Sequence, residues 1–359
     1  MKKSLYFTPG PAQLYPTVIK HFQKGFDLQI PSISHRGKQF SEIFADAATG
    51  LKKLLLIPDD YHIFFVGSAT EAMERTIQNC VEKYSWHFVN GSFSKRFFVT
   101  AEELGKQPLS STVDSGLGFD FKHIAIPDKT ELICFTHNET STGVMLPTKE
   151  IEKMAKHYTD MLVAVDIVSS VPYVDLDYRL LDVVFFSVQK GFGLPAGLGV
   201  MIVSPRAIEK SEKLLEKGIS VGSYRGFSSL LAFANKNQTL ETPPVLEMYV
   251  LGKVIKDMQR KGIEVIRKET DEKAEMLYDF FDHSDVFSAV IRDKKFRSRT
   301  VILADIQKVK GNLEKILLQK GFIVGSGYGI HKNTQIRIAN FPTHSISDMK
   351  RLIKALKAV

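Results

Sequence analysis

Short runs of apolar residues alternate with helix-like patterns through the first two thirds of the chain. The runs YHIFFVG, ELICFTHN, MLVAVD, DVVFFSV and GLGVMIVS are largely continuous stretches of apolar residues rather than alternating ones. Strands of this kind are buried on both faces, as in a mostly parallel sheet that helices cover. Their alternation with helices predicts an α/β fold with a doubly wound layer.

The pattern changes towards the C-terminus. Residues 244–267 are predicted to form one long helix, and beyond it the strands VFSAVI, RTVILADI, FIVGS and TQIRIAN mix with helices in an α+β order. A chain of 359 residues also exceeds the usual size of a single core. We therefore expect a large domain over residues 15–250 and a smaller domain from residues 1–14 and 260–359. Residues 9–11, Pro-Gly-Pro, suit neither helix nor strand and are expected near the active site.

Composition narrows the class of protein. Hydrophobic residues make up 44% and charged residues 25% of the chain, as in an ordinary soluble enzyme. The formal net charge is +8, but bases stand beside acids, as in RKETDEKAEM, so we expect solvated helix faces and no nucleic-acid partner. No apolar run approaches the ~18 residues of a membrane span, and the start of the chain does not resemble a secretory signal. Cys80 and Cys134 suit a reducing cytoplasm, and no metal site is expected.

Two ionisable residues directly follow buried runs. Asp166 ends MLVAVD, and Lys190 stands between VVFFSV and the glycine-rich GFGLPAGLG. Ligands of parallel sheets bind beyond the carboxyl ends of the strands, so both side chains are well placed for chemistry. A lysine that loses hydration has a lowered pKa, and its neutral amine can form a Schiff base. Taken singly, a capping aspartate and a surface lysine at a turn remain the alternatives.

Two polar turns follow other predicted strands. The turn GSATEAMERT opens a helix whose unpaired N–H groups and dipole favour a phosphate near Ala69 and Thr70. Ser68 and Glu71 also match a capping box, and capping alone could explain them. After ELICF comes HNETSTG, residues 137–143, which can hydrogen-bond a ring hydroxyl or simply form a polar loop. The chain lacks the glycine motifs of nucleotide sites.

The order and spacing of these segments resemble a known family. YFTPGPAQLYPTVI, SISHRGKQF, NGSFSKRF, HNETSTG, DIVSS, SVQKGFGLPAGLGV, ETPPVLEMYVLGKV and QIRIANF are similar to segments of the class V aminotransferases of pyridoxal 5′-phosphate (PLP) fold type I, most closely of their phosphoserine aminotransferase branch. The lysine segment with an aspartate 24 residues upstream is the most specific match. The resemblance covers essentially the whole chain. It implies a large domain with a mostly parallel sheet covered by helices and a smaller α+β C-terminal domain.

Carried over by position, the resemblance implies that PLP is the cofactor and that Lys190 and Asp166 are catalytic. Lys190 would form the Schiff base and shuttle a proton, and Asp166 would keep the pyridine nitrogen protonated so that the ring is an electron sink. Phe93 stands where the family usually has a tryptophan stacked on the ring. Thr140 would hydrogen-bond the ring hydroxyl.

The resemblance assigns the cofactor phosphate to Ala69, Thr70 and Gln189, with Thr242 reaching in from a second subunit. It therefore implies a homodimer with shared active sites. Glu241 stands where the family commonly has asparagine. Because a carboxylate beside a phosphate is unfavourable, we expect Glu241 to turn away or to be protonated.

For the substrate, the resemblance implies that Arg337 clamps the α-carboxylate in a bidentate geometry. His35 and Arg36 would bind the phosphate of phosphoserine or the distal carboxylate of glutamate. The expected reaction exchanges an amino group between L-glutamate and 3-phosphooxypyruvate, which gives O-phospho-L-serine and 2-oxoglutarate in serine biosynthesis. Some phosphoserine enzymes have a further arginine where this chain has Thr70 and Glu71. An alanine– or serine–glyoxylate aminotransferase is the alternative, and a non-catalytic protein of the same fold is a third hypothesis.

Overall fold

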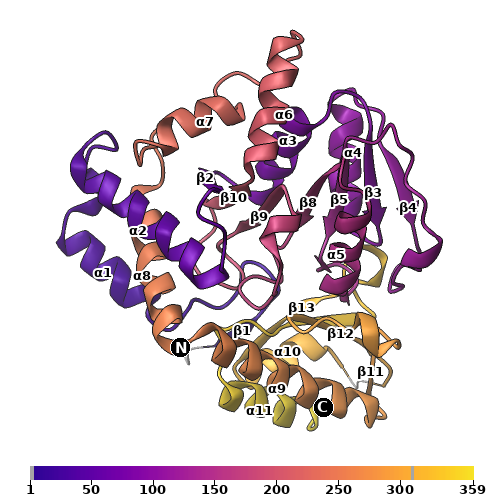
Figure 1. Cartoon of the computed structure of the whole chain (residues 1–359). Coiled ribbons are helices and arrows are strands. Elements are labelled where there is room, and N and C mark those ends of the chain that lie inside the picture. The colour runs from indigo at the N-terminus through magenta and orange to yellow at the C-terminus, as the bar shows by residue number, and fades with distance from the viewer. Residues whose placement is uncertain (1–3, 309–310) are drawn as a thin grey trace.

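The computed structural model describes residues 4–308 and 311–359, which form two main sheets with helices packed against each, the larger in the upper part of Figure 1. The larger sheet has seven strands, and all its neighbouring pairs are parallel except those of its one reversed strand, β10. In spatial order the strands are β2 (His62–Val66), β10 (Gly199–Val203), β9 (Val183–Ser187), β8 (Leu162–Asp166), β5 (Leu132–Thr136), β3 (Ser85–Val89) and β4 (Leu109–Thr112). The expected α/β class is confirmed.

Helices cover both faces of this sheet, as the continuous apolar runs predict. Val184 and Phe186 of β9 pack in the core under α2 and α8, whereas Val183 and Phe185 pack in the core under α3. The helices of this part are α1 (Val18–Asp27), α2 (Lys38–Leu55), α3 (Ala69–Cys80), α4 (Ser92–Glu103), α5 (Thr148–His157), α6 (Pro205–Glu216), α7 (Phe227–Ala234) and α8 (Val245–Lys261). Beside the sheet, β6 (Asn138–Glu139) and β7 (Val144–Met145) form a short hairpin.

The smaller sheet draws on both ends of the chain. Its strands, in spatial order, are β1 (Leu5–Phe7), β13 (Phe322–Ser326), β14 (Gln335–Ala339), β12 (Val301–Ile306) and β11 (Phe287–Ala289). The helices α9 (Ile263–Asp282), α10 (Leu313–Gln319) and α11 (Ile346–Leu356) belong to this part. The division into residues 15–250 and residues 1–14 with 260–359 stays our proposal, and residues 1–3 and 309–310 of it lie outside the described residues.

One local expectation about this part needs correction. The predicted single helix over residues 244–267 is wrong, because α8 ends at Lys261 and α9 begins at Ile263. Gly262 between them has φ +88°, which a helix cannot continue through. Near the N-terminus, Leu5–Phe7 forms a strand in parallel register with β13, a pairing that the short apolar stretch did not reveal.

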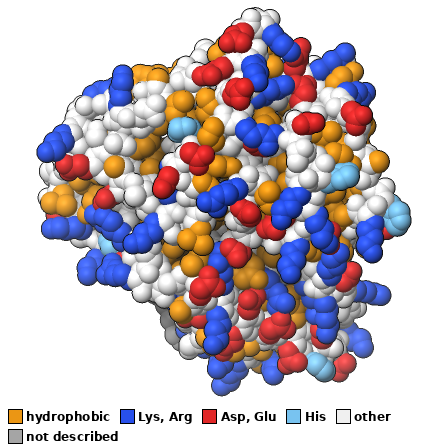
Figure 2. All heavy atoms as spheres, viewed as in Figure 1, with side chains coloured by type: hydrophobic (Ala, Val, Ile, Leu, Met, Phe, Trp, Pro, Cys, Tyr) orange, Lys and Arg blue, Asp and Glu red, His pale blue; other side chains and the backbone are white. Residues whose placement is uncertain are grey.

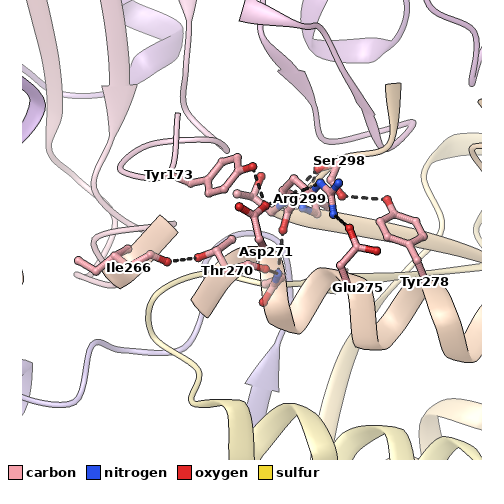
Figure 3. A network of polar contacts seen from close by, with 11 residues as sticks. Tyr173, Ile266, Thr270, Asp271, Glu275, Tyr278, Ser298 and Arg299 are labelled. Atoms are coloured by element: carbon pink, nitrogen blue, oxygen red, sulfur yellow. Dashed lines mark hydrogen bonds and ion pairs between the residues drawn. The ribbon is translucent and has the colours of Figure 1, made fainter. Parts of the chain in front are cut away.

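A polar network joins the two parts of the molecule (Figure 3). The hydroxyl of Tyr173, which follows β8 in the larger part, donates to Asp271 Oδ1 of α9 at 2.8 Å. Arg299 approaches the same carboxylate at 3.8 Å and also pairs with Glu275. The hydroxyl of Tyr278 donates to the carbonyl of Ser298 at 2.8 Å. The contact of Tyr173 with Asp271 therefore holds α9 against the loop that follows β8, and the other contacts lie within the smaller part.

The surface carries charge of both signs. On the face drawn in Figure 2, lysine and arginine side chains are interspersed with acids over both parts rather than gathered in one patch. None of the helices in the described ranges combines the length and the apolar character needed to cross a membrane.

Close approach of the backbone at Gly191 gives a stability prediction. A Cβ at this residue would lie 1.9 Å from the carbonyl oxygen of Val171 and 2.9 Å from Pro172, so Gly191→Ala must displace backbone next to Lys190. We expect the free energy of unfolding, measured by denaturant titration, to fall by about 3 kcal/mol. Gly252→Ala in α8 is the matched control, because its nearest neighbour is 3.7 Å away. The control should be unchanged or more stable by about 0.5–1 kcal/mol, and equal stability of the two variants would contradict the steric argument.

Candidate active site

A cavity of about 370 Å³ lies at the carboxyl edge of the large sheet. Asp166 is the last residue of β8, Lys190 follows β9, and the turn into α3 follows β2. The N-terminal segment Pro9–Pro11 and Arg337 of β14 line the same cavity from the side of the small sheet. The structure brings together eight of the residues predicted for the site, which are Ala69, Thr70, Phe93, Thr140, Asp166, Gln189, Lys190 and Arg337.

The amine of Lys190 is buried in this cavity, with the residue 7% exposed. Its Nζ donates to Thr140 Oγ1 at 3.2 Å and lies 5.2 Å from the centroid of the Phe93 ring. Burial lowers the pKa of Lys190 to about 8, although the nearby Asp166 carboxylate acts in the opposite direction. A Cβ on Gly10 would lie 2.9 Å from Lys190 Cε, so only glycine lets the N-terminal segment cover the lysine this closely.

The two carboxylate oxygens of Asp166 differ in their contacts, because only one of them accepts a hydrogen bond from the described residues. Its Oδ1 accepts the backbone N–H of Val168 at 2.8 Å, as the capping alternative requires. Within the described chain, Oδ2 has no hydrogen bond. Burial raises the pKa of Asp166 to about 7, against the lowering effects of that hydrogen bond and of Lys190. Oδ2 is therefore available to a cationic or N–H group of a ligand, which would stabilise the charged carboxylate.

The turn into α3 is capped in an unexpected way. Ser68 Oγ accepts the N–H of Glu71 at 3.1 Å, as a capping box predicts. The Glu71 carboxylate, however, accepts the N–H of Gly67 at 2.9 Å instead of the N-cap N–H. The Glu71 side chain therefore stabilises the turn through its hydrogen bond with the backbone N–H of Gly67.

The first turn of α3 leaves one donor free. The N–H of Ala69 donates to Ser187 Oγ at 2.7 Å, whereas the N–H of Thr70 has no hydrogen-bond partner in the part of the chain that is described. Gln189 Oε1, buried and without a described partner, lies in the wall of the same cavity. An uncapped N–H at the positive end of a helix is a suitable donor for an anion.

Arg337 lies on the opposite wall. Its Nε donates to the carbonyl of Ser326 at 2.8 Å, and its guanidinium carbon is 5.2 Å from the centroid of the Tyr328 ring. Burial lowers its pKa from the usual value. The two terminal nitrogens of the guanidinium group form no hydrogen bond with the described residues, so they can bind the two oxygens of a carboxylate.

Three predicted residues lie away from this cavity, namely His35, Arg36 and Thr242. Arg36 donates through Nη2 to the carbonyl of Leu240 at 2.7 Å and through Nη1 to that of Thr239. Arg36 therefore holds the segment that leads into Thr242. These residues form a second group on the same chain.

Glu139 is a buried residue whose importance the sequence did not indicate. It has no exposed surface, and its carboxylate accepts the N–H groups of Phe93 at 3.1 Å and Ser94 at 2.9 Å. It also accepts the hydroxyl of Ser141 at 2.6 Å. A carboxylate at the N-terminus of α4 is favoured by the helix dipole, and it fixes Phe93 beside Lys190. The only indication of Glu139 in the sequence was the presence of an acidic residue within the polar segment HNETSTG.

Glu241 does not line the cavity. Its Oε1 lies 2.6 Å from Nη2 of Arg225, an arginine that the sequence did not single out. The expectation that Glu241 turns away from a phosphate is consistent with this pairing.

Comparison with known proteins places the chain among similar sequences and structures. The family model for class-V aminotransferases matches residues 5–340. A phosphoserine aminotransferase of Corynebacterium glutamicum (strain R) is 27% identical over 357 residues, which cover 98% of this chain and 93% of that protein. The crystal structure of a phosphoserine aminotransferase from Cytophaga hutchinsonii is 48% identical, with a TM-score of 0.98 and coverage of 100% and 99%. An alanine–glyoxylate aminotransferase from Nostoc sp. is 21% identical with a TM-score of 0.80, covers 100% of this chain and 95% of its own, and shares the fold.

The lowered pKa of Lys190 gives a test of the site. In ligand-free protein, residue 190 should react with an amine reagent half-maximally near pH 8. Asp166→Asn removes the negative charge that raises this pKa, so the reaction profile should move to lower pH. Peptide mass spectrometry against pH measures both, with the exposed Lys38 as the internal standard. A profile that moves to higher pH in Asp166→Asn would exclude this coupling.

Proposed function

The chain belongs to the class-V aminotransferase family, whose members are PLP-dependent transaminases, and from this premise we propose that it exchanges an amino group between L-glutamate and 3-phosphooxypyruvate. The observation that carries this choice of substrate is the 48% identity, over the whole chain, to a protein named phosphoserine aminotransferase. The resemblance to the alanine–glyoxylate enzyme is far lower in sequence and supports the fold alone. We further propose a role in serine biosynthesis in the cytoplasm.

The cavity residues suit PLP as a cofactor. The buried amine of Lys190 suits an aldehyde, the free Asp166 Oδ2 suits a ring N–H, and the uncapped N–H of Thr70 suits a phosphate. When bound, PLP supplies an aldehyde and a ring that accepts the electron pair released from the substrate's Cα. The Phe93 ring, which Glu139 fixes on the first turn of α4, would stack on the ring of the cofactor.

The chain's own groups would then move protons and hold the substrate. A cationic ring nitrogen beside Asp166 would lower the raised pKa of this carboxyl, so that Asp166 stays ionised and keeps the nitrogen protonated. Lys190 would accept the proton from the substrate's Cα, because a pKa near 8 leaves a useful fraction of the amine neutral at physiological pH. The free fork of Arg337 would orient the substrate through its α-carboxylate.

We propose a homodimer in which His35, Arg36 and Thr242 serve the cavity of the partner subunit. The proposal is supported by the lining of the cavity in their own chain, which includes none of the three. Arg36 anchors the segment before Thr242, so one surface would present both a substrate-binding and a phosphate-binding group.

A substrate panel tests the reaction. The purified protein with O-phospho-L-serine and 2-oxoglutarate should form L-glutamate, measured by a coupled glutamate assay. Lys190→Ala should abolish this activity, with a loss on the order of 10³-fold or more, because no other amine is placed to replace it. Faster turnover of L-alanine with glyoxylate would instead support the alternative function, an alanine–glyoxylate aminotransferase.

A mixing experiment tests the shared site. If the sites are shared, Lys190→Ala and Arg36→Ala, each nearly inactive alone, form a heterodimer in which one site carries both changes and the other carries neither. After dissociation and random reassociation, the mixture should recover roughly a quarter of the wild-type activity, because half of the dimers are mixed and each has one intact site. Lack of recovery, with mixed dimers verified by mass spectrometry, would show that Arg36 acts in its own subunit.

A further inference from the structure

Arg225 joins two carboxylates behind the turn that opens α3. Its Nη1 contacts Glu71 Oε1, and its Nη2 lies 2.6 Å from Glu241 Oε1. Arg225 is buried, with 8% of the residue exposed. The side chains of Glu71 and Glu241 are partly exposed, at 22% and 32%, so water screens these pairs less than surface ion pairs but is not excluded from them.

The three residues connect two segments that the site needs. Glu71 is in the first turn of α3, and its second oxygen accepts the N–H of Gly67 at the start of the turn. Glu241 directly precedes Thr242 in the segment that Arg36 anchors. Arg225 therefore links the phosphate turn to the segment that would reach the partner's phosphate.

The charges of this cluster matter to an anion nearby. Two carboxylates and one guanidinium leave a net charge of −1, and loss of the guanidinium would leave −2 beside the turn. The N-terminus of α3 provides only about +0.5 of an elementary charge. A phosphate at the turn therefore depends on the cation that offsets one of the two negative charges of Glu71 and Glu241.

We propose that Arg225 is a positioning residue that sets the phosphate affinity of the turn at residues 67–70 by offsetting part of the negative charge of Glu71 and Glu241. The inference rests on the proposed function, because it takes the phosphate of PLP as the ligand. It also explains how the chain accommodates Glu241 next to Thr242. As a purely structural clamp the cluster is incomplete, since Arg225 Nε, Arg225 Nη1 and Glu241 Oε2 are buried without a hydrogen-bond partner among the described residues. The contact of Nη1 with Glu71 is thus an ion pair without hydrogen-bond geometry.

The test compares two aldehydes that differ only in the phosphate. Full-length protein stripped of cofactor is titrated with PLP and with pyridoxal, and binding is followed by absorbance and by quenching of protein fluorescence. Arg225→Met should weaken PLP binding on the order of tenfold and leave pyridoxal binding unchanged. Adding Glu241→Gln to Arg225→Met should restore most of the PLP affinity, because the repulsive charge is gone. Arg351→Met, which removes an exposed arginine paired with Asp348, is the control and should change neither affinity.

A second variant keeps the test valid if Arg225→Met does not fold. Glu241→Gln alone leaves Arg225 paired with Glu71, and it should tighten PLP binding by a few fold with no effect on pyridoxal. The proposal is overturned if Arg225→Met weakens both aldehydes equally, if it weakens neither, or if Glu241→Gln weakens PLP. A wild-type protein that binds no PLP would overturn the proposed function as well, whereas normal wild-type binding with an unchanged Arg225→Met would overturn this inference alone.

Discussion

An amine and a carboxylate buried in the same cavity are the constraint on which this structure depends. Away from water, each of Lys190 and Asp166 is driven towards its neutral form, so the two pKa values approach each other, at about 8 and about 7. Each nevertheless stabilises the charged form of the other. A small change in the charge of a ligand can therefore move a proton at neutral pH, which is what an amino-group transfer requires of its protein groups.

The sheet keeps these groups in place at little conformational cost. Asp166 ends β8 and is paired with Phe185 in the ladder between β8 and β9, and Lys190 follows the end of β9 at Ser187. Glycines then allow close approach from outside the sheet, with Gly10 above Lys190 and Gly191 against Val171. A side chain at Gly191 would meet the backbone of Val171 and displace the lysine segment, whereas one at Gly10 would crowd the side chain of Lys190.

Those site residues that stand at or just after the end of a strand could be predicted from the sequence. Asp166 and Lys190 could be found because a buried run reports where a strand stops, and the resemblance added residues such as Arg337. Glu139 and Arg225 could not be found in this way, because their roles depend on partners distant in sequence. Glu139 binds the N–H of Ser94, 45 residues away, and Arg225 bridges two acids from separate segments. The break at Gly262 was missed for a different reason, since a glycine within a helical pattern does not reveal its φ.

The charges of the site fall into two separate groups. Near the amine, the carboxyl groups of Glu139 and Asp166 lie close to the basic groups of Lys190 and Arg337, so acidic and basic side chains are equal in number before any ligand enters. Nothing in this set remains to offset a phosphate dianion. The positive charge that would offset the phosphate must come from the N-terminus of α3 and from the residue that pairs with the nearby acids. Glu71 and Glu241 would work against a phosphate there if Arg225 did not lie between them. In the proposed function, chemistry at the ring and retention of the phosphate would therefore be controlled by different residues, and one could be altered without the other.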